Sequence, residues 1–422
     1  MSRASLSVLL DRPAPTGDGA ASSLAGVPDR DKGVAPDLSG PAEADAGTTE
    51  AASPTNGSFA QGAVPEVSRG RSVSGRALAV LAVALAVALV LSLGIGAVGI
   101  APGAVLAILA DRVGLSQLGL ALPWEYTGQQ ALVMTGIRLP RVLLGVLVGA
   151  ALAVSGALMQ GLFRNPLADP GLIGVSSGAA LGASTMIVLG GSVLSGVAAV
   201  LGFFGVAFGA FAGGLAVTVL VYRIATRGRR TDVATMLLAG IALNALCGAG
   251  TGALVLFSDE GQLRSLTFWT LGSLGGATWP TVLAVIPFVV VLLAAAPRLA
   301  RALNAMLLGE SEARGRGVRV DVVQRGGIGL AALAVGAVTA VSGLIGFVGL
   351  VVPHLVRLAL GPDHRTLLPA SALLGATLLV VTDTIARVVI EPAEVPIGIL
   401  TALGGAPFFL ALLLHRRRDY AL

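Results

Sequence analysis

Residues 170–222 decide the fold, and they read PGLIGVSSGAALGASTMIVLGGSVLSGVAAVLGFFGVAFGAFAGGLAVTVLVY. These 53 consecutive positions carry no charged side chain. A membrane-spanning helix needs about 20 apolar residues, so the run is long enough for two spans, and Gly190, Gly191 and Ser192 predict the hinge between them. Backbone groups in lipid have to be hydrogen-bonded within their own segment, so we expect both spans to be helices.

The rest of the chain has the same character. Of its 422 residues, 55% are hydrophobic and 12% are charged, and the mean hydropathy is +0.87. A soluble domain has about 25% charged residues, so we predict an all-α polytopic membrane protein. The charge-free runs predict ten transmembrane helices, at 78–98, 140–160, 172–189, 197–222, 233–256, 280–297, 326–345, 348–360, 367–390 and 396–414. The eighth is short, and 262–276 is a candidate further helix at one surface.

Residues 1–75 differ in composition from the rest of the chain. They are rich in Ala, Gly, Pro, Ser and Asp and hold one aromatic residue, Phe59. Such a segment cannot bury enough apolar surface to offset the entropy of ordering the chain, so we predict a disordered tail followed by a membrane domain over 76–418. A secretory signal peptide is not expected, because the first apolar run begins only near Ala77 and is too long for a signal core.

The distribution of arginine predicts the orientation, because cytoplasmic loops carry an excess of positive charge. With the N-terminus in the cytoplasm, seventeen arginines of residues 76–418 fall on the cytoplasmic side and five fall outside. The outer five are Arg112, Arg138, Arg141, Arg264 and Arg387. An even number of spans returns the chain to its starting side, so both termini are predicted to be cytoplasmic.

Two rare residue types exclude several kinds of chemistry. Cys247 is the only cysteine, which rules out a disulfide within the chain and argues against a cysteine metal site. Lys32 is the only lysine and it follows Asp31, so the chain lacks the Gly-Lys-Ser/Thr sequence of an ATP-binding P-loop. The arginines are spread between apolar spans, so no nucleic-acid partner is expected. Neither a metal nor a cofactor is expected.

Two stretches of the chain resemble each other. Residues 149–166 read GAALAVSGALMQGLFRNP and residues 336–353 read GAVTAVSGLIGFVGLVVP, with seven of 18 positions identical. On the predicted topology the two copies run in opposite directions, and inverted repeats are typical of transporters. A chain this rich in Gly, Ala and Val also gives such matches by coincidence, so both interpretations stay open.

Longer motifs carry a more specific resemblance. They are RLPRVLLGVLVGAALAVSGALMQGLFRNPLADPGLIGVSSGAALGA (138–183), LLGESEARGRGV (307–318), GFVGLVVPHLVRLALGPDHR (346–365), DTIAR (383–387) and EVPIGILTALGGAPFFLALLL (394–414). In this order they resemble the permease subunits of ABC importers for iron chelates and vitamin B12, the FecCD family, over about residues 76–418. Within the family, MQGLFRNPLADPGLIGVSSGAALGA and FWTLGSLGGATW (268–279) are most similar to haem permeases, although ferric-siderophore permeases share much of both.

The resemblance implies a type II ABC importer permease fold with ten helices, working as a homodimer or as two related subunits. It implies two ATPase subunits on the cytoplasmic side and a substrate-binding lipoprotein or periplasmic protein outside, in a bacterial cytoplasmic membrane. ATP hydrolysis then lies on a separate subunit, and this chain is not itself an enzyme. The cargo is expected to be an iron chelate, haem first, with a ferric siderophore or cobalamin as the alternative.

Charged residues on the outer side are the first candidate site. The resemblance implies that Arg138, Arg141 and Arg387 dock acidic side chains of the binding protein. Exposed guanidinium groups pair well with carboxylates, whereas interfacial snorkelling is the alternative. Asp383 lies four residues before Arg387, so the two can form an intrahelical ion pair. A carboxylate inside a span is otherwise a functional candidate, as in an ion-coupled secondary transporter.

The charged segment 298–325 is the second candidate site. The resemblance places the coupling-helix pattern of the family, GExxARxxG, at Gly309, Glu310, Ala313, Arg314 and Gly317. We expect a short amphipathic helix, beginning at Leu307 and Leu308 and held by two spans, that sits in a cleft of the ATPase. Such a helix transmits closure of the ATPase as a rigid-body movement. A solvated charged loop is the alternative.

The transport pathway is the third candidate, and the family lines it with the fifth and tenth helices at the dimer axis. The resemblance places a gate at Ala234 and Thr235 and the lumen near Asn244, Gly398 and Gly404. An interhelical hydrogen bond for Asn244 and close helix packing for the glycines are the alternatives.

The segment RNPLADPG (164–171) is expected to be a structural hinge before the third span. Its prolines lack an N–H, and Asn165 or Asp169 can accept hydrogen bonds from the first free amides of that helix. We expect this hinge to face the ATPase.

Overall fold

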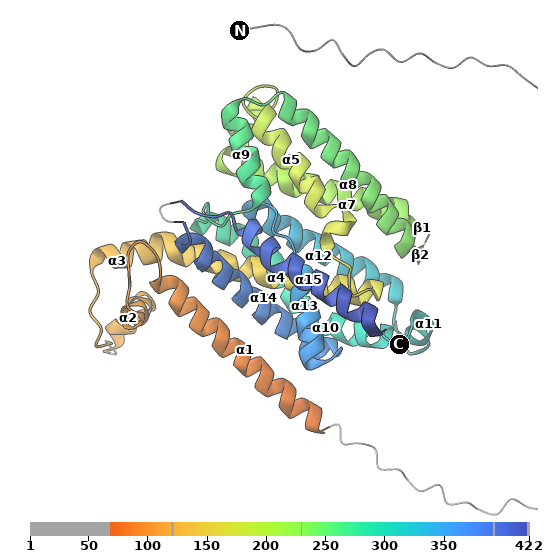
Figure 1. The fold of residues 1–422 in the computed structure, drawn as a ribbon, viewed down its shortest axis with the longest axis horizontal. Helices are drawn as coiled ribbons and strands as arrows, with labels where there is room; N and C mark the ends of the chain where they lie inside the picture. The colour runs from red at the N-terminus through yellow and green to blue at the C-terminus, as the bar shows by residue number, and fades with distance from the viewer. Residues whose placement is uncertain (1–67, 120–121, 229, 391–392, 420–422) are drawn as a thin grey trace, which may run out of the picture. The chain divides into compact units, whose positions relative to one another are not determined.

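The computed structural model describes residues 68–119, 122–228, 230–390 and 393–419 (Figure 1). The predicted disordered tail over 1–75 lies almost wholly outside these residues. Within them the long elements are all helices, and the named strands form one short hairpin between β1 (Thr226–Arg227) and β2 (Arg230–Thr231). The predicted all-α class is therefore confirmed.

The helices differ widely in length. In chain order they are α1 (Ser68–Gly94), α2 (Pro102–Arg112), α3 (Gly128–Val133), α4 (Leu139–Phe163), α5 (Val175–Leu189), α6 (Ser195–Leu201), α7 (Gly205–Ala225), α8 (Val233–Leu256), α9 (Glu260–Leu271), α10 (Trp279–Met306), α11 (Glu310–Gly315), α12 (Val320–Ser342), α13 (Val348–Leu360), α14 (His364–Val388) and α15 (Ile397–Asp419). One π-helical turn, Met134–Arg138, and three 3-10 turns, Ser116–Leu118, Pro170–Ile173 and Gly202–Phe204, lie between them.

Seven segments of the described chain are long and apolar enough to cross a bilayer. They are Gly75–Gly94, Gly128–Phe163, Ser195–Ala225, Val233–Leu256, Trp279–Met306, Val320–Ser342 and His364–Val388. Three further apolar helices are shorter, namely Val175–Leu189, Val348–Leu360 and Ile397–Ala411. Each of the ten predicted spans overlaps one of these segments, and seven of them have the length to span on their own.

The predicted hinge between the third and fourth spans is present, because α5 ends at Leu189 and α6 begins at Ser195. The candidate helix at 262–276 is also present, as α9. The first boundary is wrong: α1 ends at Gly94 instead of 98, and a helix that was not predicted, α2, follows. Because Pro is well suited to the first turn of a helix, Pro102 marks the start of α2.

Two later boundaries also differ from prediction. The sixth span, predicted to end at 297, continues as α10 to Met306, because Pro297 removes only one hydrogen bond and the surrounding helix carries on. The seventh ends at Ser342, because Gly343 takes a φ of 68° and terminates the helix. The predicted loop over 298–325 is shorter than expected, because α10 continues to Met306 and α12 begins at Val320.

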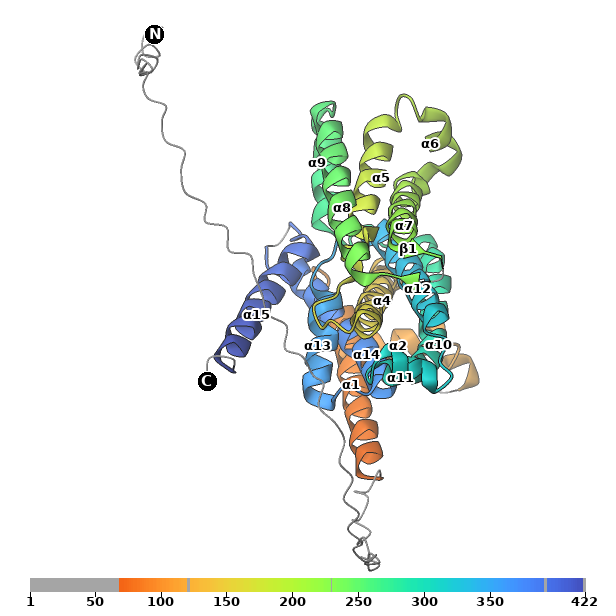
Figure 2. The ribbon, with the colours of Figure 1, turned by 90° about the vertical axis from the view of Figure 1, so that its right-hand side faces the viewer.

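Helix α4 is the centre of the bundle. It packs against α1, α10, α12, α13 and α14, and the ribbon views place it among them (Figures 1 and 2). Twenty-one of its 25 residues are buried. A helix that is apolar on all sides belongs in the interior, and α4 occupies that place here.

Glycines set how closely α4 approaches its neighbours. A Cβ on Gly149 would come within 2.3 Å of the Gly375 carbonyl oxygen on α14. A Cβ on Gly156 would come within 1.8 Å of the Gly349 carbonyl oxygen on α13. Small residues at such crossings let helix backbones pack closely in membranes, which explains the high glycine content of the chain.

The two similar stretches do not adopt equivalent structures. Residues 149–163 form continuous helix in α4, whereas in the second copy the helix stops at Ser342 and a new helix, α13, begins at Val348. Gly343 has positive φ, while its counterpart Gly156 is helical. The structure thus favours coincidence over an inverted repeat for this pair.

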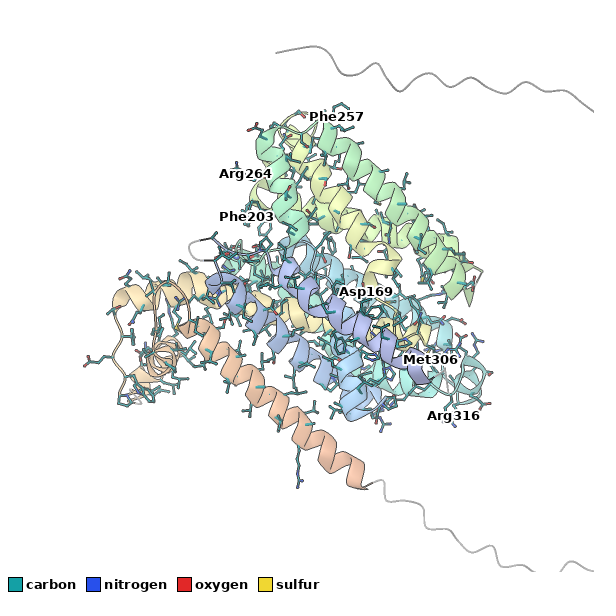
Figure 3. All side chains as sticks on the ribbon, in the orientation of Figure 1. Asp169, Phe203, Phe257, Arg264, Met306 and Arg316 are labelled. Atoms are coloured by element: carbon teal, nitrogen blue, oxygen red, sulfur yellow. The ribbon has the colours of Figure 1, made fainter. Side chains whose placement is uncertain are left out.

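The two predicted sides of the membrane correspond to different ends of the described unit. Arg264 and Phe257, which belong to the predicted outer side, lie at one end in Figure 3, and Met306 and Arg316 lie at the other. The helices α7 and α8 join through the β1–β2 hairpin, which lies toward the end that holds α11 in Figure 1.

Candidate functional site

Polar side chains gather at the two ends of α4. At its N-terminal end, Arg138 and Arg141 meet residues of α1, α14 and the segment before α15. At its C-terminal end, Arg164 meets α11. A helix of 25 residues is about 37 Å long at 1.5 Å per residue. One stiff element therefore connects the two clusters.

Arg141 is the centre of the first cluster. Its guanidinium contacts Asp383 on α14, at 3.0 Å from Nη2 and 3.1 Å from Nε, and Glu394, at 2.7 Å from Nη1 and 3.0 Å from Nη2. Asp383 is 2% exposed. A buried charge is tolerated when it is paired and fully hydrogen-bonded, and the arginine fork meets both conditions for Asp383.

Arg387 completes the pairing of Asp383 and reaches α1. Its Nε lies 3.3 Å from Asp383 Oδ2, which is the intrahelical ion pair that the spacing predicts. Its Nη2 donates to the Ser92 hydroxyl at 2.7 Å and to the Ser92 carbonyl at 3.2 Å. With two arginines bound to it, Asp383 is not a lone carboxylate.

Arg138 binds the end of α1 from the other side. Its Nη1 donates to the carbonyls of Leu93 and Gly94, at 2.7 and 3.0 Å, and its Nη2 donates to the carbonyl of Val98. The last carbonyls of a helix have no partner within that helix, and the helix dipole favours positive charge there. Arg138 therefore caps the C-terminal end of α1.

The expectation that Arg138 and Arg141 present exposed forks is wrong, since they are 5% and 7% exposed. The N–H groups of both guanidiniums donate to carbonyls and carboxylates of the same chain, and these bonds allow the two charges to be buried. The side chain of Glu394, at 47% exposure, is the part of the cluster that is most open. Docking of a binding protein at this end stays a prediction.

The backbone before α4 is adapted to this arrangement. Pro140 has no N–H, so the helix cannot form a regular bond from that position. Met134–Arg138 forms a π-helical turn instead, in which the Leu139 N–H donates to the Met134 carbonyl. A π turn accommodates one extra residue and is frequent at functional sites, and here it directly precedes both buried arginines.

The cluster also changes the ionisation of Glu394, which lies outside the spans. Its hydrogen bond with Arg141 holds the pKa of Glu394 below the usual 4.5, and partial burial, which acts in the opposite direction, does not overcome it. Glu394 was not among the predicted site residues. The sequence could have indicated this residue, because Glu394 is the first residue of the motif EVPIGILTALGGAPFFLALLL (394–414).

The second cluster surrounds α11. Glu310 lies 3.3 Å from Arg314 one turn later and 3.7 Å from Arg164 at the end of α4, and it accepts a hydrogen bond from Gln324 on α12 at 3.3 Å. Arg314 also lies 3.6 Å from Asp321. These contacts tie the short helix to two long ones. Because the side chains are partly exposed, the ties are individually weak and act together.

The predicted coupling motif has a structural explanation. Gly309 and Gly317, on either side of α11, have φ of 113° and 80°, which a residue with a Cβ rarely adopts. Ala313 is fully buried, so a larger side chain has no space there. The expected amphipathic helix begins at Glu310, later than predicted. Leu307 and Leu308 therefore precede it, and they are 47% and 56% exposed. Contact with an ATPase stays a prediction.

The pathway residues on α8 make local contacts. Asn244 accepts a hydrogen bond from the Ser177 hydroxyl on α5, which is the interhelical bond that was the alternative to a lumen role. Thr235 donates its backbone N–H to Asp232, which caps α8, and Ala234 lies in the same first turn. The structure thus brings these residues to the start and the middle of one helix.

The two predicted pathway glycines differ from each other. A Cβ on Gly398 would lie 2.3 Å from the Leu271 carbonyl oxygen, so this glycine permits close packing between α15 and the end of α9. A Cβ on Gly404 would meet nothing within 4 Å. Packing accounts for Gly398 alone, and Gly404 lies on an open face of α15.

The hinge before α5 caps a different element from the one predicted. Asp169 Oδ1 accepts from the Gly171 N–H at 2.7 Å and caps the 3-10 turn Pro170–Ile173, whereas Gly174 precedes α5. Asn165 bonds the Leu167 N–H instead. Burial raises the pKa of Asp169, and the Gly171 amide only partly offsets this.

Metal binding finds no support among the described residues, which contain no group of three or more His, Cys, Asp and Glu side chains placed to hold an ion. Cys247 is buried in α8 and forms no disulfide.

Apolar helices around a buried α4, with a polar cluster at each end, are typical of a multi-pass membrane protein. A profile of the FecCD transport family matches residues 84–415. The chain therefore belongs to the FecCD transport family.

Relatives with assigned names agree with this. The hemin transport system permease protein HmuU of Yersinia pestis is 46% identical over 317 residues, which cover 75% of this chain and 93% of that protein. The cobalamin import system permease protein BtuC of Halobacterium salinarum is 44% identical over 301 residues, covering 71% and 78%. A solved inward-facing structure of a metal-chelate type ABC transporter has 33% identity and a TM-score of 0.68, covering 81% of this chain and 99% of that one.

These comparisons confirm the predicted class. The chain is a multi-pass membrane protein and the permease subunit of an ABC importer. Like its relatives it is not itself an enzyme. The rival class, an ion-coupled secondary transporter, lacks support from both the family and the paired state of Asp383.

Proposed function

We propose that this permease imports an iron chelate, haem first, with a ferric siderophore or cobalamin as the alternative cargo. The observation that carries this order is the 46% identity to a hemin permease, against 44% and 40% for cobalamin permeases. The margin is narrow, so the proposal also draws on the two haem-like stretches, 159–183 and 268–279.

The working assembly that we propose has two copies of this chain, two ATPase subunits and one substrate-binding lipoprotein or periplasmic protein. All ten apolar segments then cross the cytoplasmic membrane of a bacterium, and both termini are cytoplasmic. The arginine distribution supports this orientation, because positive charge accumulates on the cytoplasmic side. We place the dimer axis along α8 and α15, where exposed leucines such as Leu246 and Leu403, at 67% and 66%, leave the helix faces free for a partner.

We assign docking of the binding protein to the end that holds Arg138, Arg141 and Arg387. Three guanidinium groups there face two carboxylates, so the cluster keeps an excess of positive charge. An acidic partner surface is attracted to such an end. Since the arginines are buried, they act mainly by holding α1, α4 and α14 in the geometry that the partner meets.

Coupling is assigned to α11 and the two exposed leucines before it, Leu307 and Leu308. An apolar patch beside a charged helix is suited to a cleft in a partner protein. Movement of α11 is passed to α4 and α12 through Glu310, which contacts both. Opening and closing of the pathway near Ala234, Thr235 and Asn244 then follows from a shift of whole helices.

Uptake by proteoliposomes containing the permease, its ATPase and its binding protein tests this function. Haem, a hydroxamate siderophore and cobalamin are offered side by side, with and without ATP, and vesicles carrying a proton gradient but no ATPase serve as the control. We expect ATP-dependent accumulation of haem. Accumulation of cobalamin alone would overturn the cargo, and uptake driven by the proton gradient would overturn the mechanism.

A further inference from the structure

A cavity of about 600 Å³ lies between α10 and α14, away from the helices assigned to the dimer axis. Its volume is within the range of roughly 300–1,000 Å³ typical of small-molecule sites. Eleven residues line it. Five come from α10, between Leu293 and Arg301, and six come from the first ten residues of α14. None of the predicted docking, coupling or pathway residues is among them.

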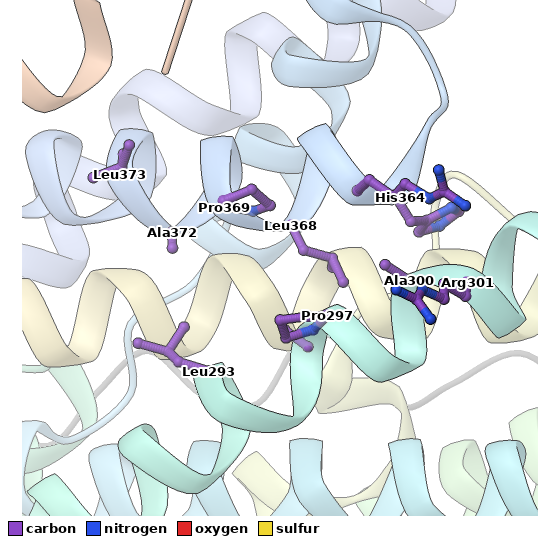
Figure 4. A pocket seen from close by; sticks show the side chains of 11 residues that line it. Leu293, Pro297, Ala300, Arg301, His364, Leu368, Pro369, Ala372 and Leu373 are labelled. Atoms are coloured by element: carbon purple, nitrogen blue, oxygen red, sulfur yellow. The ribbon is translucent and has the colours of Figure 1, made fainter. Parts of the chain in front are cut away.

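The cavity is polar at one end and apolar at the other. Figure 4 shows His364 and Arg301 together at one end, and Leu293 and Leu373 at the opposite end. Arg365 also lines it. The lining thus contains two arginines and no carboxylate, with the charged groups confined to one end.

Small and ring-shaped side chains leave space unfilled between the two helices. Pro297 in α10 and Pro369 in α14 both line the cavity, together with three alanines. Proline interrupts the backbone hydrogen bonding of a helix, and alanine fills little volume. Pro297 and Pro369 are exposed, so the cavity opens sideways to the surroundings of the bundle.

The charge at the polar end is only partly balanced. The carboxylate of Asp363 lies near Arg365. Partial burial acts to raise the pKa of Asp363, but hydrogen bonds from the Arg365 amide and the Asn304 side chain, together with the charge of Arg365, outweigh this and lower it. For Arg301, the described residues supply neither an ion pair nor a hydrogen-bond partner. An exposed guanidinium without a partner is suited to a phosphate group, which it can bind with two parallel hydrogen bonds.

We propose that this cavity binds an anionic phospholipid, with its phosphate at Arg301 and Arg365 and an acyl chain along the apolar end. An amphipathic cavity that opens toward lipid and carries arginines at one end matches the chemistry of such a molecule, since basic pockets between membrane helices bind anionic headgroups. The proposal requires only that the chain is embedded in a membrane. The orientation proposed above places the headgroup in the cytoplasmic leaflet.

Purified full-length protein in a nonionic detergent tests the proposal, with phosphatidylglycerol as the probe. Native mass spectrometry and the melting temperature report binding, while phosphatidylcholine and inorganic phosphate are the comparison ligands. We expect phosphatidylglycerol alone to stay bound and to raise the melting temperature. Replacing Arg301 and Arg365 with Ala should weaken binding by about tenfold or more. Arg298→Ala, on the same helix but outside the cavity, is the matched control.

Two further measurements separate this site from lipid bound elsewhere. Phosphatidylglycerol with a photoreactive acyl end should crosslink near Leu293 or Leu373, and Ala372→Leu, which fills the apolar end and leaves the charges intact, should abolish that crosslink. Equal binding by the arginine variant and the Arg298→Ala control would overturn the proposal. An equal effect of inorganic phosphate, or crosslinks only at other helices, would overturn it as well. The assay uses neither ATPase nor cargo, so its failure is distinct from failure of the proposed transport function.

Discussion

Truncation of Arg141 to Ala is the sharpest test of the buried charge cluster. It removes three hydrogen bonds to Asp383 and two to Glu394. Asp383, at 2% exposure, would keep Arg387 at 3.3 Å as its ionic partner. Breaking a buried ion pair costs about 3–5 kcal/mol. Because Arg387 still balances the charge of Asp383, we expect a loss near the lower end, about 3 kcal/mol, for Arg141→Ala. Glu394 adds little, because its side chain is 47% exposed and water replaces its partner.

The loss should grow when the buried carboxylate is removed as well. Replacing Arg141 with Met and Asp383 with Leu together leaves Arg387, whose side chain is 9% exposed, without its ionic partner. Arg387 retains its bonds to Ser92 in that variant. A buried charge without its counter-ion is less stable than a buried pair, so we expect the double variant to be less stable than Arg141→Ala by about 1 kcal/mol or more.

Equilibrium unfolding in mixed micelles, followed by the fluorescence of the three tryptophans, measures these free energies. Arg264→Ala, an exposed arginine on α9, is the control and should change stability by less than about 1 kcal/mol. A loss for Arg141→Ala no greater than that of the control would refute the structural role of the cluster. A double variant more stable than Arg141→Ala would refute the charge argument.

Three other predictions concern separate parts of the chain. Glu310→Gln weakens the ties of α11 to α4 and α12, so ATP hydrolysis should continue while uptake per ATP falls severalfold, whereas the exposed Glu312→Gln should behave as wild type in the same vesicle assay. Gly156→Ala puts a Cβ 1.8 Å from the Gly349 carbonyl oxygen and should cost about 1–3 kcal/mol, seen as a lower melting temperature; an unchanged value would mean that α4 and α13 separate freely. Because the folded state lowers the pKa of Glu394 below 4.5, its contribution to stability is complete above that pH and is lost below it. From about pH 5 to about pH 3 the melting temperature of wild type should therefore fall more steeply than that of Glu394→Gln, and parallel curves would contradict the assignment.

The long apolar elements could be predicted from the sequence because their ends carry local signals. α8 and α13 match the predicted 233–256 and 348–360 residue for residue. Asp232 caps the first of these helices, and Gly361, with φ of 86°, ends the second. The short α2 was missed because the apolar run continues across the turn at Gly94, so that hydrophobicity alone does not reveal the break.

The burial of the arginines could not be predicted in the same way. Arg141 meets Asp383 and Glu394 across 242 and 253 positions of sequence, and only the packing of α4 against α14 makes these contacts. Topology alone places an arginine near the outer surface, and whether its side chain faces solvent or a neighbouring helix depends on the rotation of that helix. The coupling motif was different, because two of its residues are glycines whose positive φ fixes the ends of α11.

The separation of the cluster in sequence has a consequence for biosynthesis. Arg138 and Arg141 enter the membrane with an early helix, and the carboxylates that neutralise Arg141 are translated some 240 positions later. A nascent chain that stops before α14 thus holds cations in a span without counter-charges, a state that lipid tolerates poorly. We therefore expect products that end before α14 to be less stable in the membrane than the full chain, because the ion pairs of Arg141 form only after Asp383 and Glu394 have been made.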